Sequence, residues 1–262
     1  YDYDRRSRQY TVVERSPEGV RTEHRFDARG RLIALDVGNR PVMRLVRDGN
    51  HIEHRSNARG LRTTTEYDAH RNPIRVRHPD GSELRMRYEA VRNRLVERVD
   101  EAGVVTQFTY DARGNLTRLT EAAGLPEQRI TEYTYNQYGE REARSIKSAG
   151  PNGEDLLTTW VYDAWGNVSA ETNPANETTT YTHNAQGQVL TWTNAENETD
   201  TLGYDAGGLL RSHRDPLGHT TQFRYDKVGR RTEVIQPLAG GRNLTTTFGF
   251  LPNGWLETIT DP

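Results

Sequence analysis

The sequence predicts an all-β protein made of tandem β-hairpins, and three observations lead to this prediction. A short motif recurs at a nearly constant interval, each interval holds two turn signals, and residues between the turns alternate in polarity. Apolar residues make up only 33% of the 262 residues, whereas about half is usual in a globular domain. No segment keeps a 3.6-residue apolar period. We therefore expect a polar sheet in place of a conventional solid core.

The recurring motif is an aromatic residue followed by Asp-x-x-Gly, then Asn or Arg, then an apolar residue. Its clear copies begin at Phe26, Tyr110 and Tyr162, and its looser copies begin at Tyr67, Tyr88, Tyr135, His183, Tyr204, Tyr225 and Phe250. From Tyr67 onward the copies are 21 to 27 residues apart. A wider gap before Tyr67 is interpreted as two periods, with a degenerate copy near Asp48-Gly49-Asn50. We predict a single array of about 11 repeats over residues 1–262.

Each period holds a second turn signal about ten residues before the aromatic residue. Examples are His78-Pro79-Asp80-Gly81 and Asp215-Pro216-Leu217-Gly218. Proline fixes φ at the entry of the turn, aspartate binds its own backbone, and glycine adopts a positive φ. Two turns per period leave two strands per period, which predicts roughly 22 strands in all.

The strands themselves are predicted from alternation with a period of two. β-Forming and apolar residues share one face in residues 84–88, 106–110 and 221–225, and polar residues occupy the other face. At about 4.8 Å per strand, 22 strands give a strip about 105 Å wide. Open sheets seldom exceed about ten strands without curling, so we expect the strip to curl and spiral as an open segment of a hollow shell. Residues 121–128 and 146–157 interrupt the period and are predicted to be extended hairpin tips.

Residues that could carry catalysis or bind a metal do not form a recognisable pattern. The chain has no cysteine, which excludes disulfides, thiolate nucleophiles and Cys-ligated zinc. His51 and His54 are three residues apart in predicted β structure, so their rings should point to opposite faces. Carboxylate pairs such as Glu196 and Glu198 lie in exposed, turn-rich sequence. We predict no catalytic residue, no metal site and no cofactor, and hence no enzyme.

Other functional classes also lack support. Basic and acidic residues are interspersed, so nucleic acid is not an expected partner. No apolar run reaches the roughly 18 residues that span a bilayer. The four tryptophans, Trp160, Trp165, Trp192 and Trp255, are scattered over several repeats. We expect them to pack between hairpins, although a carbohydrate platform is an alternative.

With the aromatic-Asp-x-x-Gly units and the turns between them, as in residues 215–230, the chain resembles the YD repeats of Rhs proteins. Related repeats occur in the C subunits of insecticidal Tc toxins and in teneurins. The resemblance implies a β-strip that spirals into a hollow shell, which in bacterial polymorphic toxins encloses a C-terminal toxin polypeptide. It also implies the residues of the repeat signature, which are Phe26, Asp27, Gly30, Tyr67, Asp68, Tyr88, Tyr110, Asp111, Gly114, Asn115, Tyr135, Gly139, Tyr162, Asp163, Gly166, Asn167, Gly187, Tyr204, Asp205, Gly208, Asp215, Pro216, Gly218, Tyr225, Asp226, Gly229 and Gly254.

Several repeats depart from the family pattern. Arg71 and Arg92 replace the turn glycine, which predicts that Asn72 and Asn93 adopt the positive φ instead. Glycines 139, 187 and 229 are followed by residues other than Asn, which predicts altered turns there. A complete C-terminal cleavage motif of the family is absent, and the chain begins without methionine, so we expect an internal fragment of a larger protein.

The resemblance predicts a structural encapsulation scaffold. Its partners would be the remainder of the Rhs shell and an enclosed toxin polypeptide, with secretion-spike or chaperone proteins as further candidates and edge-to-edge self-association of the isolated fragment. The protein would be made in a bacterial cytoplasm and then secreted or delivered to a target cell, for example by type VI secretion. A cell-surface adhesion or carbohydrate-binding module is the alternative. A glycosidase is a third hypothesis, which needs two carboxylates about 5–9 Å apart across a cleft.

Overall fold

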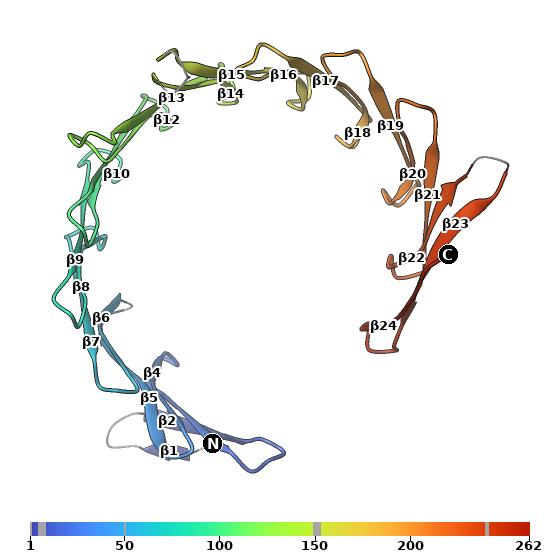
Figure 1. The fold of residues 1–262 in the computed structure, drawn as a ribbon. Helices are drawn as coiled ribbons and strands as arrows, with labels where there is room; N and C mark the ends of the chain where they lie inside the picture. The colour runs from blue at the N-terminus through green and yellow to red at the C-terminus, as the bar shows by residue number, and fades with distance from the viewer. Residues whose placement is uncertain (1, 5–8, 50, 149–152, 239–240) are drawn as a thin grey trace. The chain divides into compact units, whose positions relative to one another are not determined.

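The computed structural model describes residues 2–4, 9–49, 51–148, 153–238 and 241–262. These residues form 24 β-strands and no helix, which confirms the predicted all-β class (Figure 1). The strands are β1 (Asp2–Asp4), β2 (Gln9–Arg15), β3 (Arg21–Phe26), β4 (Leu32–Val37), β5 (Arg40–Asp48), β6 (His51–Asn57), β7 (Arg62–Tyr67), β8 (Pro73–Arg77), β9 (Glu83–Tyr88), β10 (Leu95–Val99), β11 (Val105–Tyr110), β12 (Leu116–Glu121), β13 (Arg129–Tyr135), β14 (Arg141–Ile146), β15 (Leu156–Tyr162), β16 (Val168–Thr172), β17 (Thr178–His183), β18 (Val189–Thr193), β19 (Thr199–Tyr204), β20 (Leu210–Arg214), β21 (Thr220–Tyr225), β22 (Arg231–Pro237), β23 (Asn243–Phe250) and β24 (Leu256–Thr260).

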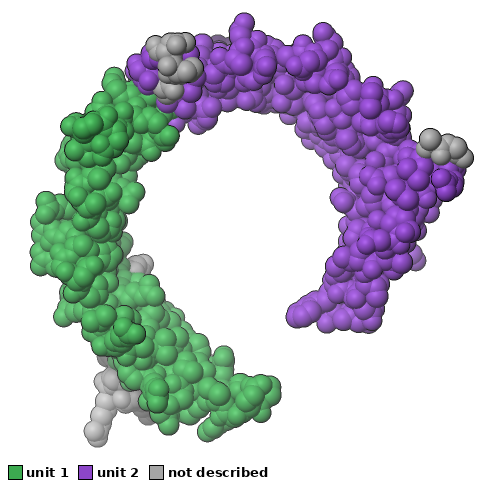
Figure 2. All heavy atoms as spheres, in the orientation of Figure 1, with its two compact units in different colours: residues 1–131 green, residues 132–262 purple. Residues whose placement is uncertain are grey.

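The chain divides into two compact units, residues 1–131 and 132–262 (Figure 2). In the first unit, each strand from β1 to β12 pairs antiparallel with the strand next to it in the chain. In the second unit, the strands from β14 to β24 do the same. Strand β13 includes residues of both units. Tandem hairpins are therefore confirmed, while the single array over residues 1–262 and its curling stay predictions.

The two faces of the strands alternate as the sequence predicts. In β11, Phe108 and Tyr110 are half-buried, whereas Gln107 and Thr109 on the other face are exposed. Strands β9, β17 and β21 show the same alternation over their last four residues. A single sheet layer cannot cover its own face, which explains why these aromatic residues stay partly accessible.

Very little of the molecule is fully buried. Among the described residues, Ala34, which is 4% exposed, is the one buried apolar residue, and the buried polar residues are Thr120, Thr131 and Thr158. The side chains that stabilise the sheet are thus cross-strand neighbours on a half-exposed surface. An example is the pair Phe108 and Leu119 on β11 and β12.

The two predicted long tips, residues 121–128 and 146–157, fall between strands except at their ends, where residues 121, 146, 156 and 157 belong to β12, β14 and β15. Residues 122–128 connect β12 to β13, and the Gly124 amide donates to the Gln128 side-chain carbonyl at 2.8 Å. The second tip connects β14 to β15, but its residues 149–152 lie outside the described part of the chain. Asn50, in the degenerate copy near Asp48, also lies outside it.

Candidate functional site

The repeated turn is a type I turn that ends in a left-handed glycine, and Asp111 to Asn115 shows its geometry. The Gly114 amide donates to the Asp111 carbonyl at 3.2 Å, and the Asp111 amide donates to the Asn115 carbonyl at 3.0 Å. Gly114 has a φ of 103°. The register then shifts so that Tyr110 pairs with Leu116. This combination of a turn and a one-residue bulge is a common way to close a hairpin, and it requires a residue that tolerates positive φ.

The Asp111 carboxylate holds this turn together. Its Oδ1 accepts hydrogen bonds from the amides of Arg113, Gly114 and Asn115 at 2.7–2.9 Å, and its Oδ2 accepts one from Asn115 Nδ2 at 2.9 Å. The pKa of Asp111 lies below its ordinary value, and the hydrogen bond from the Asn115 side chain contributes most to this. In the first repeat, the Arg31 side chain lowers the pKa of the equivalent Asp27 to about 2.

Asparagine performs the same task where it replaces aspartate. Asn136 Oδ1 accepts from the amides of Tyr138 and Glu140, and Asn184 Oδ1 accepts from those of Gln186 and Gln188. This turn needs a side-chain oxygen and not a negative charge, since the bonds come from neutral backbone amides.

Two predictions about departures from the motif are wrong. Gly139, Gly187 and Gly229 keep φ values of 88°, 77° and 85°, so their turns are not altered. In these turns the residue after the glycine is hydrogen-bonded to the first turn residue through its own backbone amide and carbonyl. Its side-chain type therefore does not change the turn. At the other departure Arg71 itself adopts a φ of 68°, and Asn72 does not have a positive φ. The matching prediction for Asn93 is confirmed by its φ of 58°.

Four of the tyrosines that precede a turn reach back to the preceding repeat. Tyr67, Tyr110 and Tyr204 donate from their hydroxyls to the carbonyls of residues 15 positions earlier, namely Ile52, Leu95 and Val189, at 2.8–3.0 Å. Tyr162 donates to the carbonyl of Arg141 at 2.8 Å. An aromatic ring that also bears a hydroxyl can pack on the half-exposed face and still satisfy a backbone carbonyl.

In at least three repeats, the residue after the positive-φ residue of the turn, Asn93, Gly187 or Gly229, packs on the next repeat. Arg94 lies over the Tyr110 ring at 4.6 Å, and Arg230 lies over the Phe250 ring at 4.7 Å. Gln188 Nε2 donates to the Gly208 carbonyl at 2.9 Å. The sequence prediction missed this role, although long side chains at this position, 21 to 27 residues apart, were the available signal.

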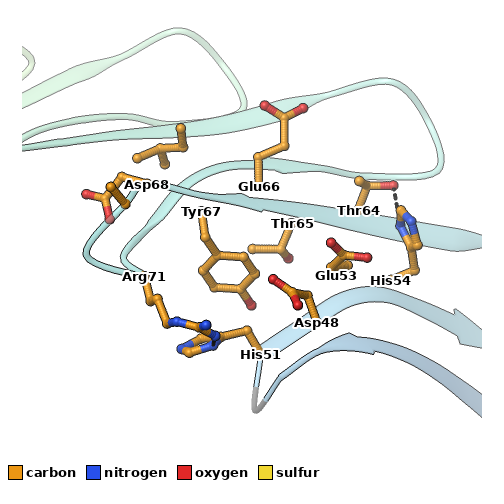
Figure 3. Close-up of a pocket in the computed structure, with 12 residues that line it drawn as sticks. Asp48, His51, Glu53, His54, Thr64, Thr65, Glu66, Tyr67, Asp68 and Arg71 are labelled. Carbon is orange, nitrogen blue, oxygen red and sulfur yellow. Dashed lines mark hydrogen bonds between the residues drawn. The ribbon is translucent and has the colours of Figure 1, made fainter.

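Hollows recur between the turns of successive repeats. Three of them, which we call the inter-turn hollows, lie at residues 48–74, 136–166 and 184–208. Each is bounded by residues of one repeat and by the aromatic residue and Asp of the next. In the first (Figure 3), Tyr67 lies beside the His51 ring at 4.9 Å, and Arg71 Nη1 lies 3.1 Å from His51 Nδ1.

The prediction that His51 and His54 point to opposite faces is wrong. Arg47 pairs with Ile52 and Val46 pairs with His54, so Glu53 is an extra residue in β6. This bulge shifts the alternation by one. Both histidines therefore line the first inter-turn hollow (Figure 3). In the described part of the chain, no group of three or more His, Asp or Glu residues is arranged to hold a metal ion.

The residues of the predicted repeat signature occupy three kinds of position. The aromatic residues end strands β3, β7, β9, β11, β13, β15, β19 and β21. The Asp, Gly and Asn residues of the signature follow in the turns after these strands, except that Gly187 follows β17 and Gly254 follows β23. Asp215, Pro216 and Gly218 form the turn after β20, at the opposite end of the hairpins, where the Asp215 carboxylate accepts from the His219 amide at 2.8 Å.

The tryptophans divide into two groups. Trp192 packs on His213, with ring centroids 5.5 Å apart, as predicted for packing between hairpins. Trp165 and Trp255 are 86% and 73% exposed, so that prediction is wrong for them. Trp165 lies at a turn tip, and Trp255 directly follows a turn glycine. The described residues also contain no helix with the length and apolar character needed to cross a membrane.

Comparison with known proteins shows which family this chain is similar to. The family model described as RHS Repeat matches residues 91–126, 162–203 and 204–242, which confirms the predicted resemblance to Rhs proteins. The double-stranded DNA deaminase toxin A of Burkholderia cenocepacia (strain H111) is 31% identical over 120 residues, covering 46% of this chain and 8% of that protein.

Solved structures share the fold. A crystal structure of TcdB2-TccC3-Cdc42 has a TM-score of 0.62 at 14% identity, over 92% of this chain and 15% of that one. A Photorhabdus luminescens Tc holotoxin pore has a TM-score of 0.61 at 15% identity, with coverage of 92% and 15%. The chain spans less than a sixth of each of these relatives.

Proposed function

We propose that this chain, which carries RHS repeats, is a non-enzymatic part of a protein shell that encloses a toxin polypeptide before delivery. The observation that carries the proposal is the single-layer sheet. The aromatic residues of β9, β11, β17 and β21 are half-exposed, and Ala34 is the one buried apolar residue among those described. A face of this kind gains stability when another polypeptide covers it.

The relatives support the toxin context. One is named as a DNA deaminase toxin, and the solved structures include Tc toxin assemblies. The expected partners are further shell segments and the enclosed polypeptide. Delivery would follow synthesis in a bacterial cytoplasm, with type VI secretion as one candidate route and secretion-spike or chaperone proteins as further partners.

Protease protection in the native full polypeptide that contains this chain tests the proposal. An enclosed segment should survive protease concentrations that degrade the same segment expressed alone. Thr109→Pro, which removes a ladder hydrogen bond inside β11, should open the wall and abolish the protection. Thr109→Ser is the matched control. Equal cleavage of the segment with and without the shell would overturn the proposal.

Surface adhesion through carbohydrate remains a second candidate because Trp165 and Trp255 are exposed. Binding to a glycan array that is lost in the Trp165→Ala and Trp255→Ala variants would favour adhesion. A shell segment should give no such binding.

A further inference from the structure

The second inter-turn hollow differs from the others in the side chains that line it. It lies between the turn after β13 and the turn after β15 and has a volume of about 650 Å³. Four aromatic residues line it, namely Tyr138, Trp160, Tyr162 and Trp165. Tyr138 and Trp165 occupy the same position in successive turns and are 79% and 86% exposed. Two large rings therefore lie accessible at its rim.

The same hollow is strongly acidic. The carboxylates of Glu140, Glu142 and Asp163 line it, and no lysine or arginine does. The neighbouring Arg141 packs its guanidinium over the Tyr133 ring at 4.7 Å, which is not part of the lining. Burial, and then the charge of Glu140, raise the pKa of Tyr162, while the charge of Arg141 acts in the opposite direction.

The three carboxylates differ in how many hydrogen bonds they accept within the protein. Glu140 accepts from Asn136 Nδ2 at 2.6 Å through Oε2, and Asp163 accepts from Asn167 Nδ2 at 3.0 Å. The Glu142 side chain is exposed and has no hydrogen bond or ion pair within the described residues. Glu142 thus offers a free carboxylate beside the aromatic rim.

The third inter-turn hollow provides an internal comparison. It has the same backbone plan, beginning with Asn184 where the second begins with Asn136. Gln186, Gln188, Leu190 and Gly207 stand where the second hollow has Tyr138, Glu140, Glu142 and Trp165. The turn therefore folds without these four side chains, so folding of the repeat does not account for them.

We propose that the second inter-turn hollow binds an arginine side chain of a partner polypeptide. A guanidinium stacks on the faces of Trp and Tyr rings and donates paired hydrogen bonds to carboxylates. The lining supplies both types of group and contains no lysine or arginine. A neutral sugar would also stack on the rings, but it would leave the three negative charges uncompensated. This proposal does not depend on the shell function.

The test uses the peptide acetyl-Gly-Arg-Gly-amide and a matched peptide with citrulline, which keeps the shape but not the charge. Binding is measured on the chain by tryptophan fluorescence and by NMR chemical-shift changes. The arginine peptide should bind, the citrulline peptide should bind much more weakly, and added salt should weaken binding. Trp165→Ala and Glu142→Gln should each weaken binding by about threefold to fivefold.

Matched variants keep the test decisive. Trp255→Ala and Gln186→Ala, which alter sites outside the hollow, should leave binding unchanged. Placing the four side chains in the third hollow, by Gln186→Tyr, Gln188→Glu, Leu190→Glu and Gly207→Trp together, should create a second site. Equal binding of the citrulline peptide, binding of cellobiose without the arginine peptide, or unchanged affinity in folded Trp165→Ala and Glu142→Gln variants would each overturn the proposal.

Discussion

The hydroxyl of Tyr110 donates a hydrogen bond to the backbone carbonyl of Leu95 at 2.8 Å. Tyr110 ends β11, and Leu95 begins β10 directly after the turn of the preceding repeat. The bond therefore fastens one repeated turn to the next. The same link is made by Tyr67 and Tyr204, so it is a regular feature of the repeats.

Tyr110→Phe should lower the free energy of unfolding by about 1 kcal/mol, since it removes a hydrogen bond while keeping the ring. Urea unfolding followed by circular dichroism measures the change. Tyr138→Phe, at an exposed turn tip, is the control and should have no effect. Equal effects of the two substitutions would show that the cross-repeat bond contributes nothing.

Asp27 should make the free energy of unfolding depend on pH at pH values below the ordinary pKa of an aspartate. The Arg31 side chain lowers the folded-state pKa of Asp27 to about 2 from 3.8, so its contribution is complete above pH 3.8. It should be lost as the pH falls towards about 2. Asp27→Asn keeps an acceptor oxygen, as Asn136 does, but cannot titrate in this way.

The midpoint temperature of thermal unfolding should therefore fall less steeply between pH 5 and pH about 2 for Asp27→Asn than for the wild type. An NMR titration of the Asp27 carboxyl measures its pKa directly. A carboxyl that titrates at its ordinary value would contradict the account of this turn.

Arg71→Gly should stabilise the chain by about 1 kcal/mol, because glycine adopts a positive φ without the steric cost that a side chain carries. Arg71 has a φ of 68°. Arg71→Ala keeps this strain and loses the contact with His51, so it should destabilise. Urea midpoints that move in the same direction for both variants would contradict this interpretation.

Gly166→Ala should destabilise more than Gly103→Ala. Both glycines have nearly the same φ, 85° and 82°, so the backbone strain should cost about the same, roughly 1 kcal/mol. A Cβ on Gly166 would meet Glu140 Oε1 at 2.7 Å, whereas one on Gly103 meets nothing within 4 Å, and the added cost should be small because the end of the Glu140 side chain can move aside. The difference in unfolding free energy between the Gly166→Ala and Gly103→Ala variants measures the contact between repeats. Combining Gly166→Ala with Glu140→Ala should remove most of that difference.

The sequence was sufficient for the fold class because the relevant signals are local. Alternation in residues 106–110 and the Asp-x-x-Gly turns set strands and hairpins without reference to distant residues. The bulge at Glu53 was not predictable, since no side chain there marks an extra residue in the ladder. It changes which histidines share a face.

Contacts between repeats were the other part that the sequence did not reveal. The packing of Arg94 over Tyr110, and of Gln188 against Gly208, depends on how neighbouring turns lie side by side. A motif read one repeat at a time contains no information on that distance. The exposure of Trp165 was missed for a different reason, because its turn position outweighs its hydrophobicity.

Within each unit, every strand from β1 to β12 and from β14 to β24 finds its partners immediately before and after it in the chain. The strands of such a sheet can pair one after another as the polypeptide leaves the ribosome, because no strand pairs with a segment distant in the sequence. A mispaired strand then affects only its neighbours in the chain, and the strands already paired keep their register.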